Sequence, residues 1–346
     1  MSPMQKTLVK GARWIGLGLI FLVMLVVGLF SILTVYYSNL PWAALRGLAA
    51  AAVTVLLLLL GWNSFRKNAW KARGGFLGVF VGAWIWWLAI PAKLDRDWKE
   101  EVKILATAEF DGDLVTVRNM RNFTYRADKD FDAVYYDKTF DLSKIRGVDF
   151  TMSNWGLKQI SHTLLSFEFE GGNWLTVSVE TRLEKGEEYD AIQGAFKRFE
   201  LIYVVGDERD LVRVRTNFRD ETVHLYPSNA SRAQARALFV SVLKGVNRTA
   251  EDPVFYRTLG RNCTTVLVDH VNDVIDPDVS YSLDLLLTAS AVDLAYDLKL
   301  LDRSIPLADL KLACDITAIA KANGDAPDFS AIIRKKRDEA IAAAKK

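Results

Sequence analysis

The sequence predicts an α+β protein in which three N-terminal transmembrane helices precede a soluble domain. Long apolar runs lie before residue 93, whereas short segments with alternating hydrophobicity follow residue 113 and helical periodicity begins near residue 232. These observations divide the chain into four predicted parts. They are a transmembrane region (1–92), a charged connector (93–112), a periplasmic domain (113–280) and a C-terminal helical extension (281–346).

The predicted membrane spans cover residues 14–37, 41–62 and 75–92. Because an α-helix rises about 1.5 Å per residue, each run can cross a hydrocarbon core about 30 Å thick, the third with little tilt. The first run is too long for the apolar part of a signal peptide. Lys and Arg gather before the first span and between the second and third. By the positive-inside rule, we expect a multi-pass protein of the bacterial inner membrane with everything after Pro91 in the periplasm.

Composition excludes several classes of protein. A formal net charge of +2 over 346 residues gives no electrostatic support for binding nucleic acid. Three scattered histidines show no metal-ligand spacing, and no glycine-rich phosphate loop is present, so we expect no metal and no cofactor. Two cysteines, Cys263 and Cys314, cannot form a disulfide framework, although one bridge between them stays open.

The soluble part is expected to form an antiparallel sheet followed by helices. Gly, Asp and Asn separate seven predicted strands, which are residues 114–120, 133–140, 162–170, 174–181, 199–205, 211–217 and 222–227. An apolar stripe from Ala235 to Val246 predicts an amphipathic helix, and a second helix should begin at Cys263. Three more helical segments are expected after Tyr281. Within them, 282–301 is apolar but contains three Asp residues, so we interpret it as a core or membrane-surface helix.

Residues 161–182 predict a β-hairpin that carries His162. A turn at 171–173 would place Leu165 opposite Val179 and collect the apolar side chains on one face. In that register Glu180 is a diagonal neighbour of His162, about 7–8 Å away. A carboxylate at this position would fix the imidazole tautomer and stabilise the imidazolium. Ser178 is the alternative for this role, and His162 as a plain polar residue at a strand end is the alternative to any catalytic role.

The segment around Cys263 predicts a reactive thiol at the start of a helix. Asn262 is a good N-cap residue, and the positive end of a helix favours a thiolate and can bind an oxyanion. A buried, half-hydrophobic cysteine is the alternative. His270 would lie about 10 Å along the same helix, so it is too far to act as the base. His162 is preferred over His224, and a histidine that precedes the cysteine implies a circularly permuted thiol-protease arrangement.

Four stretches together resemble a known family. They are "NFTYRADKDFDAVYYDKTFDLSKIRGVDF", "SHTLLSFEFEGGNWLTVSVETR", "DERDLVRVRTN" and "RNCTTVLVDHVN". They are similar to the periplasmic domain that gives its name to the bacterial lipoprotein N-acyltransferase family called Lnb, over residues 115–275. The resemblance implies a circularly permuted papain-like (NlpC-type) fold with Cys263 as nucleophile and His162 as base. The order of the His and Asn-Cys motifs also resembles that of lecithin retinol acyltransferases, which take acyl groups from phospholipids.

The function expected from this resemblance is that of a membrane-anchored thiol acyltransferase. Phospholipid would donate the acyl group, and an amine such as a lipoprotein N-terminus would accept it. Arg213 and Arg215, on one face of the predicted strand 211–217, could hold the lipid phosphate, although a solvated face is the alternative. A cell-wall amidase or endopeptidase with the same Cys–His pair, and a non-catalytic envelope scaffold, are the competing functions.

Overall fold

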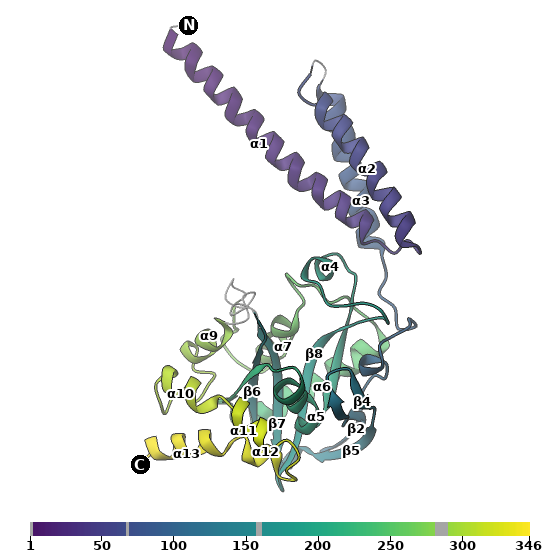
Figure 1. Cartoon of the computed structure of the whole chain (residues 1–346). Helices are drawn as coiled ribbons and strands as arrows, with labels where there is room; N and C mark the ends of the chain where they lie inside the picture. The colour runs from purple at the N-terminus through teal and green to yellow at the C-terminus, as the bar shows by residue number, and fades with distance from the viewer. Residues whose placement is uncertain (1–2, 67–68, 157–160, 281–289) are drawn as a thin grey trace. The chain divides into compact units, whose positions relative to one another are not determined.

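The computed structural model describes residues 3–66, 69–156, 161–280 and 290–346 (Figure 1). It divides into two compact units. The first comprises Met1–Ala92 and Asp190–Arg198, and the second comprises Lys93–Tyr189 and Phe199–Lys346. Each unit is considered by itself.

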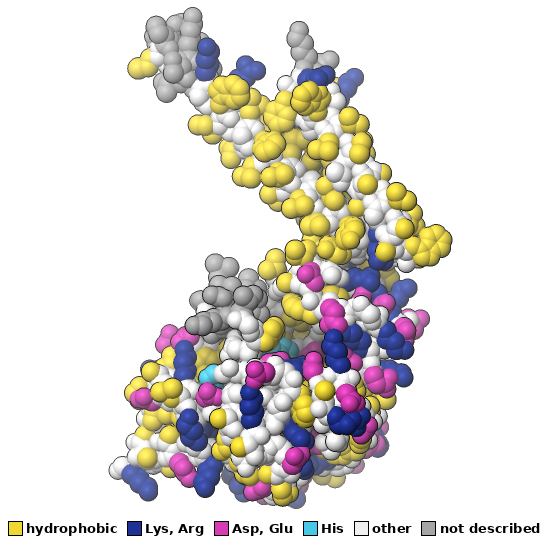
Figure 2. Space-filling view, in the orientation of Figure 1, with side chains coloured by type: hydrophobic (Ala, Val, Ile, Leu, Met, Phe, Trp, Pro, Cys, Tyr) yellow, Lys and Arg dark blue, Asp and Glu magenta, His cyan; other side chains and the backbone are white. Residues whose placement is uncertain are grey.

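The first unit contains the three predicted membrane helices, α1 (Pro3–Tyr36), α2 (Ala43–Asn63) and α3 (Ala69–Ala89). Their candidate spans are Lys10–Tyr36, Ala43–Asn63 and Ala69–Ala89, which confirms the prediction from hydropathy. Figure 2 shows that hydrophobic side chains cover these helices and that Lys and Arg gather at the end bearing the N-terminus. A short helix, α4 (Ala191–Ala195), belongs to this unit. Next to it the Phe196 ring packs 5.5 Å from Phe30 and 5.9 Å from Tyr37.

The second unit is built on a mixed eight-stranded sheet. Its strands are β1 (Thr107–Asp111), β2 (Leu114–Arg121), β5 (Tyr135–Asp141), β6 (Ile145–Asn154), β7 (Ser161–Phe169), β8 (Asn173–Arg182), β9 (Glu200–Gly206) and β10 (Thr222–Pro227). Their order is β1-β2-β9-β8-β7-β6-β10, with β5 paired to β2. Strands β3 (Thr124–Ala127) and β4 (Asp130–Asp132) form a separate pair.

The expectation of a purely antiparallel sheet is wrong at one junction. Strands β2 and β9 run parallel, and they meet where Arg121 lies opposite Gly206. A β-carbon at Gly206 would lie only 2.5 Å from the Arg121 carbonyl oxygen, so a residue with a side chain would push the strands apart. The contact joins segments far apart in sequence, which a strand-by-strand analysis of hydrophobicity does not detect.

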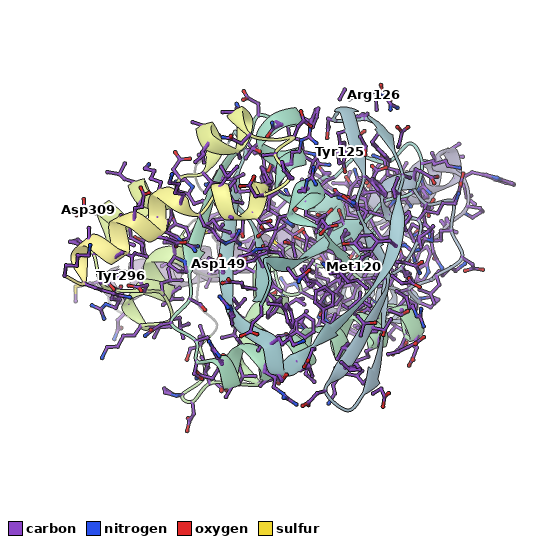
Figure 3. All side chains as sticks on the ribbon, turned by 90° about the horizontal axis from the view of Figure 1, so that it is seen from below. Met120, Tyr125, Arg126, Asp149, Tyr296 and Asp309 are labelled. Carbon is purple, nitrogen blue, oxygen red and sulfur yellow. The ribbon has the colours of Figure 1, made fainter. Side chains whose placement is uncertain are left out.

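Helices cover both faces of the sheet. Helices α6 (Arg232–Glu251) and α7 (Cys263–Asn272) form the main core with one face, and both were predicted. The other face carries α5 (Glu208–Leu211), a π-helical turn at Val214–Phe218, α11 (Thr317–Ala322) and α12 (Phe329–Ile332). Helices α9 (Ala291–Asp297), α10 (Leu307–Cys314) and α13 (Lys335–Ala344) and the 3-10 turns Glu100–Val102 and Leu142–Lys144 complete the unit. Figure 3 shows its interior, where Met120 is fully buried, whereas Arg126 lies at the rim.

The hairpin β7–β8 has the predicted face partition but a different register. Leu165 lies opposite Val177, not Val179, and Phe167 lies opposite Leu175. Gly171 and Gly172 both adopt positive φ, of 77° and 72°, so the turn occupies 170–172 and the strand begins at Asn173. The shift is by two residues, and because side chains alternate with a period of two, each keeps its predicted face.

The predicted strand at 211–217 is wrong. This segment forms the end of α5 and the π-helical turn, and both Val212 and Arg215 are buried. It is covered on several sides, so its hydrophobic pattern carries no reliable period. Arg213 and Arg215 therefore do not share a strand face. Arg213 donates to Asp325 (2.6 Å), and Arg215 donates to Glu180 and Glu221.

The C-terminal extension is helical, as predicted, but its described residues form five short helices, α9 to α13, where three segments were expected. Residues 282–289 of the helix expected at 282–301 lie outside the described residues, and the remaining residues, 290–301, contain α9. Cys263 and Cys314 are both free thiols. Burial raises the pKa of Cys314 to about 12, which suits a core residue of α10.

A buried arginine holds this extension against the sheet. Arg334 donates to Asp149 of β6 (2.7 Å) and to both carboxylate oxygens of Glu208 (2.6 and 2.8 Å). Its guanidinium carbon also lies 3.3 Å from the centroid of the Trp174 ring. Figure 3 shows Asp149 beside the C-terminal helices. Arg337 adds a second cation 3.0 Å from Asp149. The cluster therefore joins β6, β8 and α5 to the C-terminal extension.

Replacing Arg334 with methionine should destabilise the second unit strongly. The change leaves Glu208 buried without its partner, and breaking a buried ion pair costs about 3–5 kcal/mol. The measurement is chemical denaturation of the full chain in detergent, followed by tryptophan fluorescence. Arg126→Met is the matched control, because Arg126 pairs with Asp130 and Asp132 in solvent, where an ion pair contributes about 0–1 kcal/mol. Equal losses in both variants would contradict this role for Arg334.

Candidate functional site

Helix α7 begins at Cys263 because Asn262 caps it. The Asn262 side chain accepts hydrogen bonds from the backbone N–H groups of Thr264 (3.0 Å) and Thr265 (2.9 Å). Thr265 returns the interaction by accepting from the Asn262 N–H at 2.9 Å, which completes a capping box. Cys263 therefore occupies the first turn of a helix, where the positive end of the helix dipole lies.

The thiol of Cys263 is buried, with the residue 5% exposed. It packs in the core cluster that α6 and α7 form with the sheet, and its sulfur lies 3.9 Å from the Thr264 hydroxyl. The hydroxyl of Tyr256 interacts with both the backbone N–H and the thiol of Cys263. Burial raises the pKa of Tyr256 well above its usual value, so this hydroxyl stays protonated near neutral pH. The sequence analysis did not identify Tyr256, because nothing in the loop before α7 marks a residue that folds back onto its first turn.

His162 lies near the start of β7 and is held by Ser178 of β8. Its Nε2 is 2.6 Å from the Ser178 Oγ, and this hydroxyl donates to Glu180 Oε1 at 2.8 Å. Because the hydroxyl proton is used for Glu180, the Ser178 oxygen accepts, and Nε2 carries the proton. This assignment leaves Nδ1 of His162 as the basic nitrogen. Ser178 is thus the direct partner, and Glu180 acts on His162 mainly through it, with 3.8 Å between Glu180 Oε1 and Nε2.

Arg215 continues this polar network. It donates to Glu180 at 3.0 Å and to Glu221 at 3.2 Å, and Ser153 also donates to Glu221. Arg215 is buried, and both of its terminal guanidinium nitrogens donate to these carboxylates. Arg215 therefore serves as a counter-ion within the protein, and Arg213, paired with Asp325 elsewhere, does not join it.

The network controls two titrating groups. Burial, followed by the positive charge of Arg215, lowers the pKa of His162 to about 3, although Glu180 opposes the shift. Burial alone would raise the pKa of Glu180, but Arg215, His162 and two further arginines outweigh it and lower this pKa to about 2. Near neutral pH the structure therefore holds a neutral imidazole beside an ionised carboxylate.

Cys263 and His162 come from opposite faces of the sheet at one end of β7. Leu165 and Phe167 belong to the core on the α7 face, whereas His162 points to the same side as Ser178. Among the described residues, neither the Cys263 sulfur nor His162 Nδ1 has the other as a hydrogen-bond partner. Their sequence neighbours do touch, because the hydroxyls of Thr163 and Thr264 are 3.3 Å apart. The pairing of β7 with β8 stops at Leu164 and Ser178, so His162 lies at the open end of the hairpin.

The other two histidines lie in different surroundings. His270 of α7 bonds to Tyr203 and to Ser241, each at 2.8 Å, and is buried between α7, α6 and β9. The His224 ring of β10 stacks on Tyr226, and its backbone forms an isolated β-bridge with Asp315. Neither forms a hydrogen bond with Cys263 in the described part of the chain. Within the same residues, no group of three or more His, Cys, Asp or Glu side chains is arranged to hold a metal ion.

Comparison with known protein families gives a match. Residues 131–303 match the family model described as the Lnb N-terminal periplasmic domain. No curated protein and no solved structure matches the chain. The candidate spans, together with a domain named periplasmic, make the chain a multi-pass inner-membrane protein, which confirms the predicted localisation.

Proposed function

We propose that this chain, which belongs to the Lnb N-terminal periplasmic domain family, is a membrane-anchored thiol acyltransferase. Cys263 is the nucleophile and His162 the general base. A phospholipid donates the acyl group, and an amine such as a lipoprotein N-terminus accepts it. With His162 before Cys263 in the sequence, this arrangement corresponds to a circularly permuted papain-like enzyme.

The observation that carries the proposal is the contact between the start of α7 and the start of β7. The bond between Thr163 and Thr264 brings together the residues that directly follow His162 and Cys263. On one side is a thiol at a capped helix start, and on the other an imidazole whose Nδ1 is left free by the Ser178 and Glu180 chain. Hydrogen bonds between catalytic groups are often long before substrate binds, so the lack of a direct bond between Cys263 and His162 in the free protein does not exclude this pair.

The reaction proceeds in two transfers. The thiol of Cys263 attacks the carbonyl carbon of a lipid ester, forming a C–S bond while its proton passes to His162. The C–O bond then breaks, and His162 returns the proton to the leaving lysophospholipid alcohol. In the second transfer an amine attacks the thioester, the C–N bond forms as the C–S bond breaks, and His162 passes the amine proton to sulfur. The backbone N–H groups of the first turn of α7 and the Tyr256 hydroxyl would stabilise the oxyanion.

Mass spectrometry of the full chain tests this function. After incubation with phospholipid in nanodiscs, the peptide containing Cys263 should gain the mass of one acyl chain. Hydroxylamine should remove it, and a diacylated lipopeptide with a free N-terminus should discharge it and become N-acylated. Cleavage of cell-wall peptides without any acyl adduct would replace the transferase by an amidase. If neither reaction occurs and Cys263→Ser functions fully in cells, the chain is a non-catalytic envelope scaffold.

Glu180 should contribute by positioning His162 rather than by touching substrate. Glu180→Ala should lower kcat/KM by about 10- to 100-fold, the scale typical for a residue that orients a functional histidine, and Glu180→Gln should lose less. Glutamine keeps an acceptor for Ser178 but cannot stabilise the imidazolium that forms during proton transfer. The measurement is kcat/KM across pH for both variants. Wild-type rates in Glu180→Ala would assign the orienting role to Ser178 alone.

A further inference from the structure

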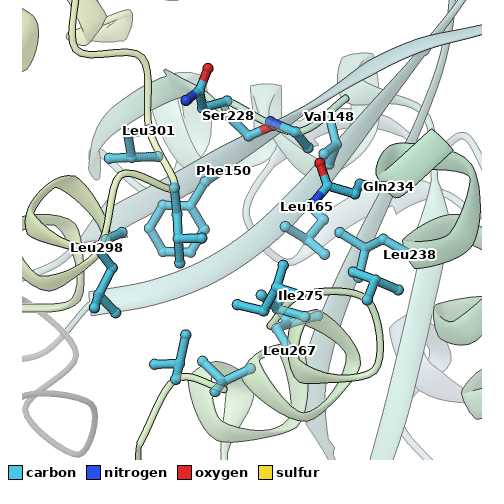
Figure 4. Close-up of a pocket in the computed structure, with 18 of the residues that line it drawn as sticks. Val148, Phe150, Leu165, Ser228, Gln234, Leu238, Leu267, Ile275, Leu298 and Leu301 are labelled. Atoms are coloured by element: carbon cyan, nitrogen blue, oxygen red, sulfur yellow. The ribbon is translucent and has the colours of Figure 1, made fainter. Parts of the chain in front are cut away.

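An apolar cavity of about 330 Å³ lies between strands β6 and β7 and helices α6, α7 and α9. Figure 4 shows Val148, Phe150 and Leu165 of the sheet on one side of it and Leu267 and Ile275 on another. Leu298 and Leu301, from the segment after α9, close a third side. The whole cavity belongs to the second unit.

The lining chemistry excludes a polar ligand. Among the described residues that line it, the side chains are mainly Val, Leu, Ile and Ala, and the only charged one is Lys299, which is exposed. Uncharged polar side chains are few, and three of them, Ser228, Asn229 and Gln234, come from one stretch between β10 and the first turn of α6. A cavity with such an apolar lining favours apolar molecules. A peptide or sugar would leave its hydrogen-bonding groups unpaired there, at a cost of about 1–3 kcal/mol each.

The cavity runs along the helix that begins at Cys263, although Cys263 itself does not line it. Thr264 lines it, followed by Leu267, Val268 and Val271 on the same helix. From Thr264 to Val271 the helix advances about 10 Å. Residues four positions apart lie on one helix face, so Leu267 is on the face that carries Cys263. The core cluster containing Cys263 also contains Leu165 and Leu267, two residues of the cavity wall.

We propose that this cavity binds the hydrocarbon chain of the acyl group while its carbonyl carbon reacts at Cys263. The inference rests on the proposed function and assigns it a substrate class, fatty acyl chains held along α7. Three apolar helices of the same chain can span a membrane, so the occupant at highest local concentration is a lipid. An apolar space lined by the helix that carries the nucleophile suits the hydrocarbon part of an acyl group.

Photo-crosslinking tests chain binding without catalysis. The full chain with Cys263→Ser is placed in nanodiscs containing phosphatidylglycerol that carries a diazirine in its acyl chain. Cross-links should map to peptides of α7 and α9. Val274→Trp and Ala295→Trp fill the cavity from two different walls, and each should reduce this labelling by about tenfold or more. Ala322→Trp, on an exposed position of α11, is the matched control and should leave it unchanged.

Chain-length preference gives a second readout in the active protein. Wild-type protein should form the thioester from butyryl and palmitoyl donors, whereas Val274→Trp and Ala295→Trp should keep the butyryl adduct and lose the palmitoyl one. Unchanged labelling and unchanged chain preference in both filled variants would overturn the cavity assignment. Lack of any adduct in wild type, with cavity-specific cross-links still present in Cys263→Ser, would sink the proposed transfer but keep the lipid site.

Discussion

Replacing Cys263 with serine should abolish acyl transfer while the protein folds and inserts in the membrane normally. A hydroxyl is nearly isosteric with a thiol but a far weaker acid, and the positive end of α7 cannot ionise it near neutral pH. Loss of a nucleophile typically lowers turnover by about 10⁴-fold or more. The measurement is the rate of N-acylation of a lipopeptide by the full chain in nanodiscs.

Cys314→Ser is the matched control for this change. Cys314 is as deeply buried as Cys263 but lies in α10 among apolar residues, in a different core cluster. Serine there buries an extra hydroxyl and should cost stability, about 1–3 kcal/mol, without slowing transfer. Equal rates for wild type and Cys263→Ser, or equal losses for both serine variants, would remove Cys263 from the chemistry.

Replacing His162 with alanine should lower the rate of thioester formation by about 10²–10⁴-fold, the contribution of a positioned general base. His270→Ala is the comparison, because His270 is also a buried histidine but bonds to Tyr203 and Ser241, away from the thiol. It should reduce stability and leave the rate per folded molecule nearly unchanged. Similar rate losses in both variants would mean that His162 is not the base.

The low pKa of His162 gives this prediction a pH signature. The neutral ring is the active form, so wild-type kcat/KM should stay level from pH 7 to 5, whereas an ordinary histidine base would titrate near pH 6.5. Stability follows the same groups. The unfolded chain binds a proton at His162 near pH 6.5 and the folded chain only near pH 3, so stability falls as pH falls through this window. His162→Ala should therefore flatten the dependence of stability on pH in this window. Below about pH 4.5 a further loss of stability comes from Glu180, because its pKa is lowered in the folded chain.

The candidate site shows which features a sequence can predict. Local sequence patterns sufficed to predict the start of α7, because Asn262 is a good N-cap residue and an apolar stripe follows it. They also gave the faces of the β7–β8 hairpin, although its register required knowing that both glycines lie inside the turn. The partners of Arg215 could not be predicted. The alternating pattern of residues 211–217 is compatible with a strand, and nothing in the sequence shows that the arginine is buried beside Glu180 and Glu221.

Long-range contacts account for the rest. The parallel pairing at Gly206 and the contact of Tyr256 with Cys263 each join two separate segments, and no local sequence pattern predicts that these segments meet. The opposite orientation of His162 and Cys263 follows from strand alternation once α7 is assigned to one face of the sheet. Only the fold supplies that assignment.

The segment Asp190–Arg198 belongs to the membrane unit although it lies within the sequence of the sheet domain, so the chain cannot be cut into the two units at one point. The second unit is interrupted at Tyr189 and resumes at Phe199, and the residues between them, with Phe196 against Phe30 and Tyr37, complete the membrane unit. A water-soluble fragment that begins at Lys93 would carry this segment without its packing partners. An exchange of these helices for an unrelated anchor would do the same. We expect either change to leave Phe196 without the Phe30 and Tyr37 rings and so to destabilise the segment Asp190–Arg198.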